Sequence, residues 1–239
     1  MNVEIYSQHL DIDLEELSFD DLGNLAETGN IDVMHTSVEK VVSETMSQGY
    51  VASVLGGEHS VTYGCLNALP EKVGVIIFDA HFDLRSEFAD LRMSHATFLR
   101  RYIEKNGCDN IVHVGGRAGS KDEWTFVEKN NLPAIFGRAF SDGGKANILL
   151  KDFLEDFDRV YISIDLDVLD PAYAPGVGNP EAGGLTIHQL LELIYAFKGK
   201  RIVGFDIVEL SPPYDNGTTS VAAAKCLTEL LCLSSLCMI

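Results

Sequence analysis

Basic residues are scarce in this sequence, which has 18 Lys and Arg against 36 Asp and Glu and a formal net charge of −18. A chain this acidic is poorly suited to the phosphate backbone of nucleic acids and better suited to cationic ligands or metal ions. Most of these acids, taken one at a time, only solvate the surface. The composition therefore predicts a small cationic ligand or a metal, and no nucleic-acid partner.

Long apolar runs and targeting signals are also lacking. No apolar run approaches the roughly 20 residues that cross a bilayer, and the opening MNVEIYSQHLDIDLEEL has neither the basic nor the apolar region of a signal peptide. The cysteines form no CxxC pair or close-set framework, which makes a reducing compartment the expectation. They are Cys65, Cys108, Cys226, Cys232 and Cys237. We expect a cytoplasmic protein with no membrane partner.

Apolar segments of strand length alternate along the chain with segments of helical periodicity. The expected strands are residues 3–6, 50–56, 72–79, 110–116, 132–137, 159–166 and 201–210. The expected helices lie near residues 35–48, 60–68, 94–106, 121–130, 145–154, 186–198 and 218–236. Thr186, and either Thr218 or Thr219, are the expected N-caps of the last two helices.

The strand segments are near-continuous runs of valine and isoleucine, which indicate strands buried on both faces. Together with the regular alternation, they predict an α/β fold, a three-layer α/β/α sandwich around a mostly parallel sheet. No internal repeat, low-complexity tract or linker divides the 239 residues, 46% of which are hydrophobic. We therefore expect residues 1–239 to form a single domain with one full core.

Polar residues collect where the expected strands end. Four strand ends carry them: Glu58 and His59; Asp79, His81 and Asp83; Asp165 and Asp167; Asp206 and Glu209. In open parallel sheets, ligands bind beyond the carboxyl ends of the strands. We therefore expect all four ends to lie on one rim of the sheet and to form a site there.

The spacing of these residues predicts that they converge. Alternate residues of an extended segment point the same way, so the three polar side chains of DAHFD (79–83) can meet on one side. Asp165 and Asp167 repeat this geometry on another strand. His59 follows two glycines, which allow the backbone to turn tightly. Together these segments offer two imidazoles and four carboxylates.

Six such ligands are too many for one tetrahedral zinc, whose structural sites are rich in Cys and His. They fit two divalent cations that share bridging carboxylates and lie roughly 3.5–4 Å apart. Oxygen-rich sites with some imidazole favour Mn²⁺ over zinc or copper. An isolated DxHxD pattern often only caps a turn, but several unpaired buried carboxylates would each cost several kcal/mol. The set as a whole therefore predicts a compensating cation.

Several motifs resemble the ureohydrolase family of arginases and agmatinases, and they occur in the family order. They are GGEHS (56–60), DAHFD (79–83), SHATFLRR (94–101), SIDLDVLDP (163–171), GGLT (183–186) and DIVELSPPYD (206–215). DAHFDLR followed by SHATFLRR is most similar to the archaeal and bacterial agmatinases. The resemblance implies an arginase-like fold, two Mn²⁺ per subunit and a homo-oligomer, a trimer or hexamer.

The same resemblance implies roles for individual residues. One manganese would be held by His59, Asp79, Asp83 and Asp165. The other would be held by His81, Asp79, Asp165 and Asp167, so that Asp79 and Asp165 bridge. His95 matches the mobile proton-transfer histidine, and Glu209 matches the acid that binds the substrate guanidinium. Asp167 would also help to handle the proton of the nucleophile.

The reaction implied is the hydrolysis of agmatine to putrescine and urea by a hydroxide that two manganese ions activate. The alternatives are other guanidino or formimino hydrolases: arginase, guanidinobutyrase, formimidoylglutamase and aminopropylagmatine ureohydrolase. A metal-dependent deacetylase would use one zinc, and the DAHxD set with its second bridging aspartate opposes it. An inactive truncated homologue is the non-enzyme alternative.

Two features depart from the family pattern. The family usually begins with an extra strand and a GxRxGP-type loop, whereas this sequence opens at MNVEIY, so we expect it to lack the usual N-terminal strand. The loop GVGNPEAGGLT (176–186) varies the commoner GTPxxGGLT, which bears on substrate shape. His113 and His188 are expected to be structural, and Arg117 to face the substrate or to stabilise the fold.

Overall fold

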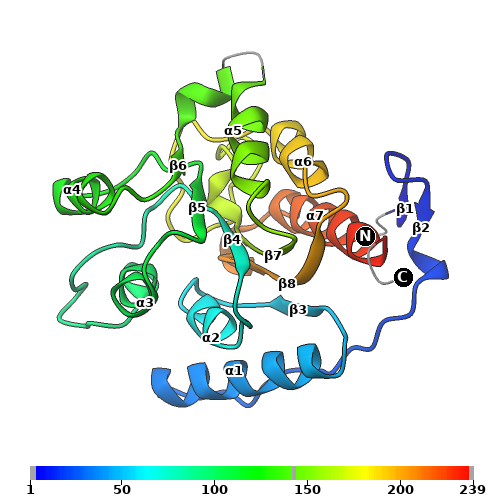
Figure 1. Cartoon of the computed structure of the whole chain (residues 1–239), viewed down its shortest axis with the longest axis horizontal. Helices are drawn as coiled ribbons and strands as arrows, with labels where there is room; N and C mark the ends of the chain where they lie inside the picture. The colour runs from blue at the N-terminus through cyan, green and yellow to red at the C-terminus, as the bar shows by residue number, and fades with distance from the viewer. Residues whose placement is uncertain (1–3, 142–143, 237–239) are drawn as a thin grey trace.

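A six-stranded sheet forms the centre of the computed structural model, which describes residues 4–141 and 144–236 (Figure 1). The strand order is β3-β8-β7-β4-β5-β6, and each pairing is parallel. The strands are β3 (Ala52–Leu55), β4 (Val73–Phe78), β5 (Ile111–Val114), β6 (Ala134–Ile135), β7 (Arg159–Asp165) and β8 (Arg201–Val208). The helices are α1 (Ile31–Ser47), α2 (Val61–Asn67), α3 (Phe98–Asn106), α4 (Lys121–Asn130), α5 (Lys145–Leu154), α6 (Ile187–Tyr195) and α7 (Thr218–Ser235).

The two faces of the sheet bury two separate hydrophobic clusters. In β4, Ile76 and Phe78 join the cluster that includes side chains of α5, α6 and α7, whereas Val75 and Ile77 join the cluster with α1 to α4. Figure 1 shows α1 to α3 on one side of the sheet and α5 to α7 on the other. Because successive strand residues point to opposite faces, an all-apolar strand needs helices on both. The predicted three-layer α/β/α fold is confirmed.

The N-caps of the last two helices were predicted with mixed success. The hydroxyl of Thr186 accepts from the N–H of Gln189, whose side chain accepts from Thr186 in return, as a capping box predicts. At α7 the prediction of a threonine cap was wrong. The carboxylate of Asp215 accepts there from the N–H groups of Thr219 and Ser220, because a carboxylate three residues before the helix reaches both.

The strand expected near residues 3–6 does not join the central sheet. A two-residue strand, β1 (Tyr6–Ser7), pairs antiparallel with β2 (Ile12–Asp13) in a separate small hairpin, and residue 3 lies outside the described part of the chain. Such a short ladder is marginal by itself. Its position must therefore depend on contacts with the helices.

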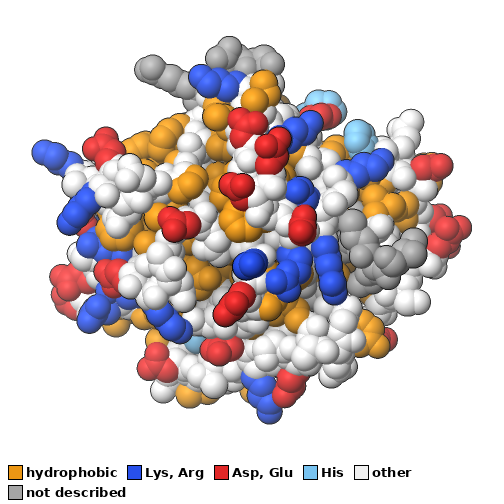
Figure 2. Space-filling view, in the orientation of Figure 1, with side chains coloured by type: hydrophobic (Ala, Val, Ile, Leu, Met, Phe, Trp, Pro, Cys, Tyr) orange, Lys and Arg blue, Asp and Glu red, His pale blue; other side chains and the backbone are white. Residues whose placement is uncertain are grey.

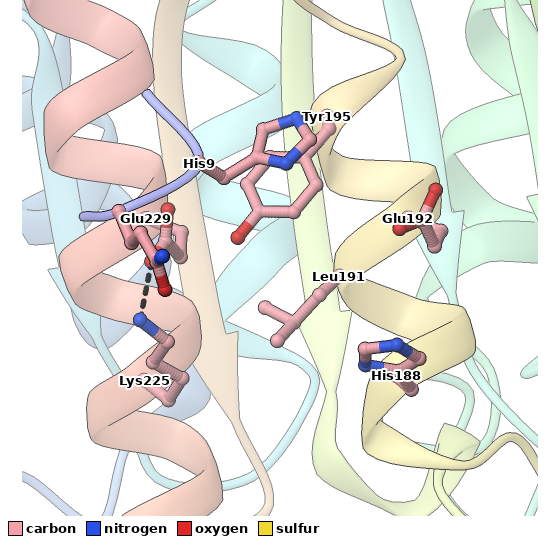
Figure 3. Close-up of a pocket in the computed structure, with 8 residues that line it drawn as sticks. His9, His188, Leu191, Glu192, Tyr195, Lys225 and Glu229 are labelled. Atoms are coloured by element: carbon pink, nitrogen blue, oxygen red, sulfur yellow. Dashed lines mark hydrogen bonds and ion pairs between the residues drawn. The ribbon is translucent and has the colours of Figure 1, made fainter. Parts of the chain in front are cut away.

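Those contacts are made with α6 and α7 (Figure 3). The hydroxyl of Ser7 donates to the buried carboxylate of Glu229 at 2.6 Å, and Lys225 pairs with the same carboxylate. The ring of His9 stacks on Tyr195 with centroids 3.7 Å apart. Around these residues lies a cavity of about 220 Å³, and Figure 3 shows His9 and Tyr195 on one side of it and His188 on another.

Within residues 4–141 and 144–236, no helix combines the length and the apolar character needed to traverse a bilayer. This agrees with the absence of a long apolar run in the sequence.

Candidate metal centre and pocket

The six predicted metal ligands meet at the carboxyl ends of three strands. His59 follows β3, the DAHFD segment follows β4, and Asp165 ends β7. Nδ1 of His59 lies 3.0 Å from Oδ2 of Asp79 and 3.2 Å from Oδ2 of Asp83. An oxygen of Asp165 lies 3.2 Å from the same nitrogen. One imidazole thus faces three carboxylates from two other strands.

A second group lies beside the first and shares Asp79 with it. Nδ1 of His81 is 2.9 Å from Oδ2 of Asp167 and 3.7 Å from Oδ1 of Asp79. Potential ligand atoms of His59, Asp79 and Asp165 lie within 4.8 Å of one another, as do those of Asp79, His81 and Asp167. Asp79 is therefore placed to bridge two cations. The expected bridging by Asp165 stays a prediction.

Two buried atoms show that this cluster fits a cation rather than a proton network. Nδ1 of His59 and Oδ2 of Asp79 make no hydrogen bond although they are 3.0 Å apart, and both side chains are only 1% exposed. Polar atoms that are buried without partners are costly. A divalent cation bound to both atoms would satisfy them.

The pKa values of the clustered side chains also indicate that the cluster needs a bound cation. Burial, with the nearby charges of Asp83 and Asp167, raises the pKa of Asp79 well above its usual value. Burial opposes protonation of His81, but its contact with Asp167 raises the pKa of that imidazole to about 9. Ionised carboxylates are therefore costly in this cluster without a positive charge beside them, and a bound divalent cation would supply that charge.

A buried hydrogen-bond network behind the cluster orients His59. Oγ of Ser163 lies 3.1 Å from Nε2 of His59 and donates to Asp206 at 2.6 Å, so Nε2 is the donor nitrogen. Thr62 and Tyr161 donate to the same carboxylate, which is 0% exposed. Nδ1 therefore keeps its lone pair for a metal. Asp206 could be singled out from the sequence as a polar residue near a strand end, but its three hydroxyl donors could not.

Two of the proposed functional residues adopt left-handed backbone conformations. Asp83 has φ 52° and Glu209 has φ 66°, values that are uncommon outside glycine. The N–H of Glu209 donates to the carbonyl of Gly57, and its Oε1 accepts from the N–H of His59 at 2.7 Å. These contacts hold the end of β8 against the loop after β3. Such strain is characteristic of functional sites.

A cavity of about 360 Å³ opens directly over the cluster. Its lining includes the metal-ligand candidates His59, His81, Asp83, Asp165 and Asp167, together with His95 and Glu209. Asp79 lies beneath them and is 1% exposed. Burial raises the pKa of Glu209, while contact with Glu58 raises that of His95. All eight predicted site residues therefore lie in one place.

Arg117 and His113 serve the loops rather than the cavity. The guanidinium of Arg117 donates to six carbonyl oxygens, which belong to Gly115, Asp167, Val168, Leu169, Glu181 and Ala182. His113 donates through Nε2 to the carbonyl of His81 at 2.7 Å. Of the two roles expected for Arg117, stabilisation of the fold is the one that these contacts support.

The sequence and the fold of this chain are similar to those of known proteins. Residues 1–232 match the Arginase family. The chain is 36% identical to an agmatinase of Bacillus anthracis, over 97% of this chain and 80% of that protein. It is 33% identical to a guanidinobutyrase of Pseudomonas aeruginosa, over 92% of this chain and 72% of that protein. The crystal structure of agmatine ureohydrolase from Thermoplasma volcanium superposes with a TM-score of 0.92 at 38% identity, covering 98% of this chain and 80% of that one.

Proposed function

The chain belongs to the arginase family, and from that premise we propose that it hydrolyses the guanidinium group of agmatine to putrescine and urea. Members of this family are hydrolases of guanidino compounds that depend on a binuclear metal centre. The observation that carries the proposal is the buried cluster in which His59 and Asp79 present atoms without hydrogen bonds. That cluster forms the floor of a cavity large enough for a small linear substrate.

The cofactor proposed is two Mn²⁺ per subunit. One ion would be held by His59, Asp79, Asp83 and Asp165, and the other by His81, Asp79, Asp165 and Asp167. When bound, two divalent cations lower the pKa of a water molecule and so supply a nucleophile for the guanidinium carbon. Asp167, whose Oδ2 lies beside His81, is proposed to take part in holding the proton of that water.

Glu209 is proposed to bind the substrate guanidinium. Its Oε1 already accepts from the backbone of His59, which fixes the carboxylate at the cavity wall. The backbone of Gly178 passes close enough that a methyl group there would lie 3.6 Å from Oε2. A carboxylate held in this way can make a charge-assisted contact with a planar guanidinium. The loop that contains Gly178 therefore borders the substrate.

His95 is proposed to deliver a proton to the departing amine. It lies in the cavity wall just before α3, and an imidazole is the side chain best suited to exchange a proton near neutral pH. The raised pKa of His95 favours the protonated form that a general acid needs.

A guanidino acid is the second candidate substrate, because Arg85 also lines the cavity and could face a carboxylate tail. The guanidinobutyrase relative is consistent with this. However, Nε of Arg85 lies 3.6 Å from the buried carboxylate of Glu123, which offsets its charge. Agmatine, a dication, remains the better match for the acidic rim.

Urea release from agmatine, arginine and 4-guanidinobutyrate by the Mn²⁺-loaded protein tests the proposal. We expect kcat/KM for agmatine to exceed the others at least about tenfold, a difference of about 1.4 kcal/mol in transition-state binding. A higher value for either competitor would overturn the substrate. A folded, metal-loaded protein that releases no urea from any of them would favour the inactive homologue.

Three further properties are proposed from the sequence. Residues 1–239 form a single domain, the protein is cytoplasmic, and it assembles as a homo-oligomer, a trimer or hexamer. Analytical ultracentrifugation of the purified chain would test the assembly, since a monomer at micromolar concentration contradicts it.

A further inference from the structure

The ring of His95 is held from two directions. Its Nδ1 lies 3.3 Å from Oε2 of Glu58, and its ring meets that of Phe88 edge to face with centroids 5.3 Å apart. The side chain of His95 is 35% exposed, so without these contacts solvent would leave it free to rotate. The proposed function uses His95 but gives no part to Glu58 or Phe88.

We infer that Glu58 is a positioning residue for the proposed proton transfer, in which it fixes the imidazole of His95. The two nitrogens of an imidazole lie on opposite sides of the ring. With Nδ1 turned toward Glu58, Nε2 is the nitrogen left to meet the substrate in the cavity. A carboxylate on one nitrogen of a catalytic histidine fixes both its orientation and its tautomer. This inference rests on the proposed function.

Glu58 is itself anchored well enough for this role. The hydroxyl of Ser60 donates to Oε1 of Glu58, which leaves Oε2 for His95. Glu58 also directly precedes His59, whose N–H is tied to Glu209. One short loop therefore directs His59 to the metal centre and Glu58 to the proton-transfer residue. The backbone of this loop therefore fixes the position of the metal-ligand candidate His59 relative to Glu58, the residue that orients His95.

Phe88 is itself held by contacts with Arg85 and Leu91. The guanidinium of Arg85 lies over the Phe88 ring, 5.3 Å from its centroid. Phe88 also begins a tight turn in which it exchanges two backbone hydrogen bonds with Leu91. Ala89 and Asp90, between them, have φ 50° and 62°, as a type I′ turn requires. Phe88 therefore has a fixed position beside His95. Glu58 supplies the polar contact that sets the orientation of the His95 ring.

The test replaces Glu58 by alanine and by glutamine in the Mn²⁺-loaded enzyme. We expect Glu58→Ala to lower kcat about tenfold or more, within the range that a positioned general acid contributes, with KM unchanged. Glu58→Gln keeps one oxygen that can accept from Nδ1 but loses the charge of the carboxylate, so kcat should fall less than in Glu58→Ala. Glu87→Ala, which removes an exposed acid two residues beyond Arg85, is the matched control and should leave kcat unchanged.

A double-mutant cycle with His95→Ala separates positioning from a structural role. If Glu58 acts through His95, Glu58→Ala should have no further effect on kcat once His95 is absent. An equal loss in both backgrounds, or bound manganese that falls in Glu58→Ala, would overturn the inference. A wild-type enzyme that releases no urea would instead defeat the proposed function. An active wild type with Glu58→Ala at full kcat would defeat this inference alone.

Discussion

Asp79 lies between both halves of the proposed metal centre, since its two oxygens face different imidazoles. Asp79→Asn should reduce bound manganese from about two ions per subunit to nearly none and abolish turnover, because a shared ligand is lost from each site. Elemental analysis of the dialysed protein would measure the loss. Retention of one full equivalent of metal would contradict the bridging role.

The metal-free protein provides the control for that substitution. Burial raises the pKa of Asp79, so this carboxyl is costly to ionise when no cation is present. Urea denaturation of both metal-free proteins should therefore find Asp79→Asn no less stable than the wild type. A clear loss of metal-free stability would mean that the substitution damages the fold, and its metal loss would then say little about ligation.

His113 predicts a pH dependence of stability. The imidazole is 0% exposed, and burial lowers its pKa to about 4. The unfolded chain, with an ordinary value near 6.5, binds this proton more readily, so stability must fall as pH falls from 6.5 toward 4. The loss from this residue should reach about 2 kcal/mol between about pH 7 and pH 5.

Urea denaturation of the wild type and His113→Gln at both pH values would measure that loss. Glutamine has an amide N–H that can reach the position of Nε2 and donate to the carbonyl of His81, but it cannot take up a proton. The variant should therefore lose about 2 kcal/mol less than the wild type on acidification. Because the comparison is a difference, the other titrating groups cancel. An identical pH dependence in both proteins would mean that the pKa of His113 is the same in the folded and the unfolded chain, which contradicts the lowered value.

The convergence of the candidate metal ligands was predictable from the sequence because side-chain direction at a strand end follows from local spacing. The network behind them was not. Ser163 and Asp206 face each other because they are register partners in β7 and β8, and neither strand order nor register can be read from one chain. The contact between His95 and Glu58 has the same origin, since 37 positions separate residues whose loops meet only in the fold.

At the scale of elements, the strands of the sheet were predictable because burial on both faces leaves uninterrupted apolar runs. β4 is VGVIIF, with every residue buried. The N-terminal segment misled the prediction because VEIY has strand composition, yet tertiary contacts decide what such a short segment does. Ser7 and His9 pack on α7 and α6, and those contacts fix the hairpin outside the sheet.

Arg117 connects three loops at the rim of the sheet, and its removal should affect one metal more than the other. Its guanidinium donates to the carbonyls of Asp167 at 2.8 Å and Glu181 at 2.7 Å, whereas no contact with His59 or Asp83 is among its interactions. Arg117→Ala should cost about 2–4 kcal/mol of stability, because several carbonyl groups lose a charged donor. The metal that Asp167 is proposed to ligate should bind more weakly, and the other should be retained.

Manganese titration and urea denaturation of Arg117→Ala and Arg117→Lys would measure both effects. Lysine restores the charge but not the planar fork that reaches several carbonyls, so it should rescue only part of the loss. Arg92→Ala, at an exposed position, is the control. Equal weakening of both metals would mean that Arg117 supports the rim as a whole rather than the loop of Asp167.

At the scale of the whole molecule, basic and acidic residues lie at opposite ends of strands β7 and β8. β7 and β8 both begin with arginine, Arg159 and Arg201, which are neighbours in register. Figure 2 shows Lys and Arg side chains gathered over the region that Figure 1 labels β7 and β8. The same two strands lead into Asp165, Asp167 and Glu209 at their other ends. These two strands therefore begin with basic residues and lead into acidic residues where the cavity opens.

The acidic residues at the mouth of the cavity predict that salt should lower kcat/KM for agmatine. An acidic rim on a chain of net charge −18 raises the local concentration of a dication, and salt screens that attraction over a Debye length of about 10 Å at 0.1 M. Raising NaCl from about 0.05 M to about 0.5 M should lower kcat/KM for agmatine roughly three- to tenfold. The value for 4-guanidinobutyrate, which has no net charge, should change less. An equal fall in kcat/KM for both substrates would mean that salt acts on the enzyme or its metals. The acidic residues at the strand ends would then have no part in substrate capture.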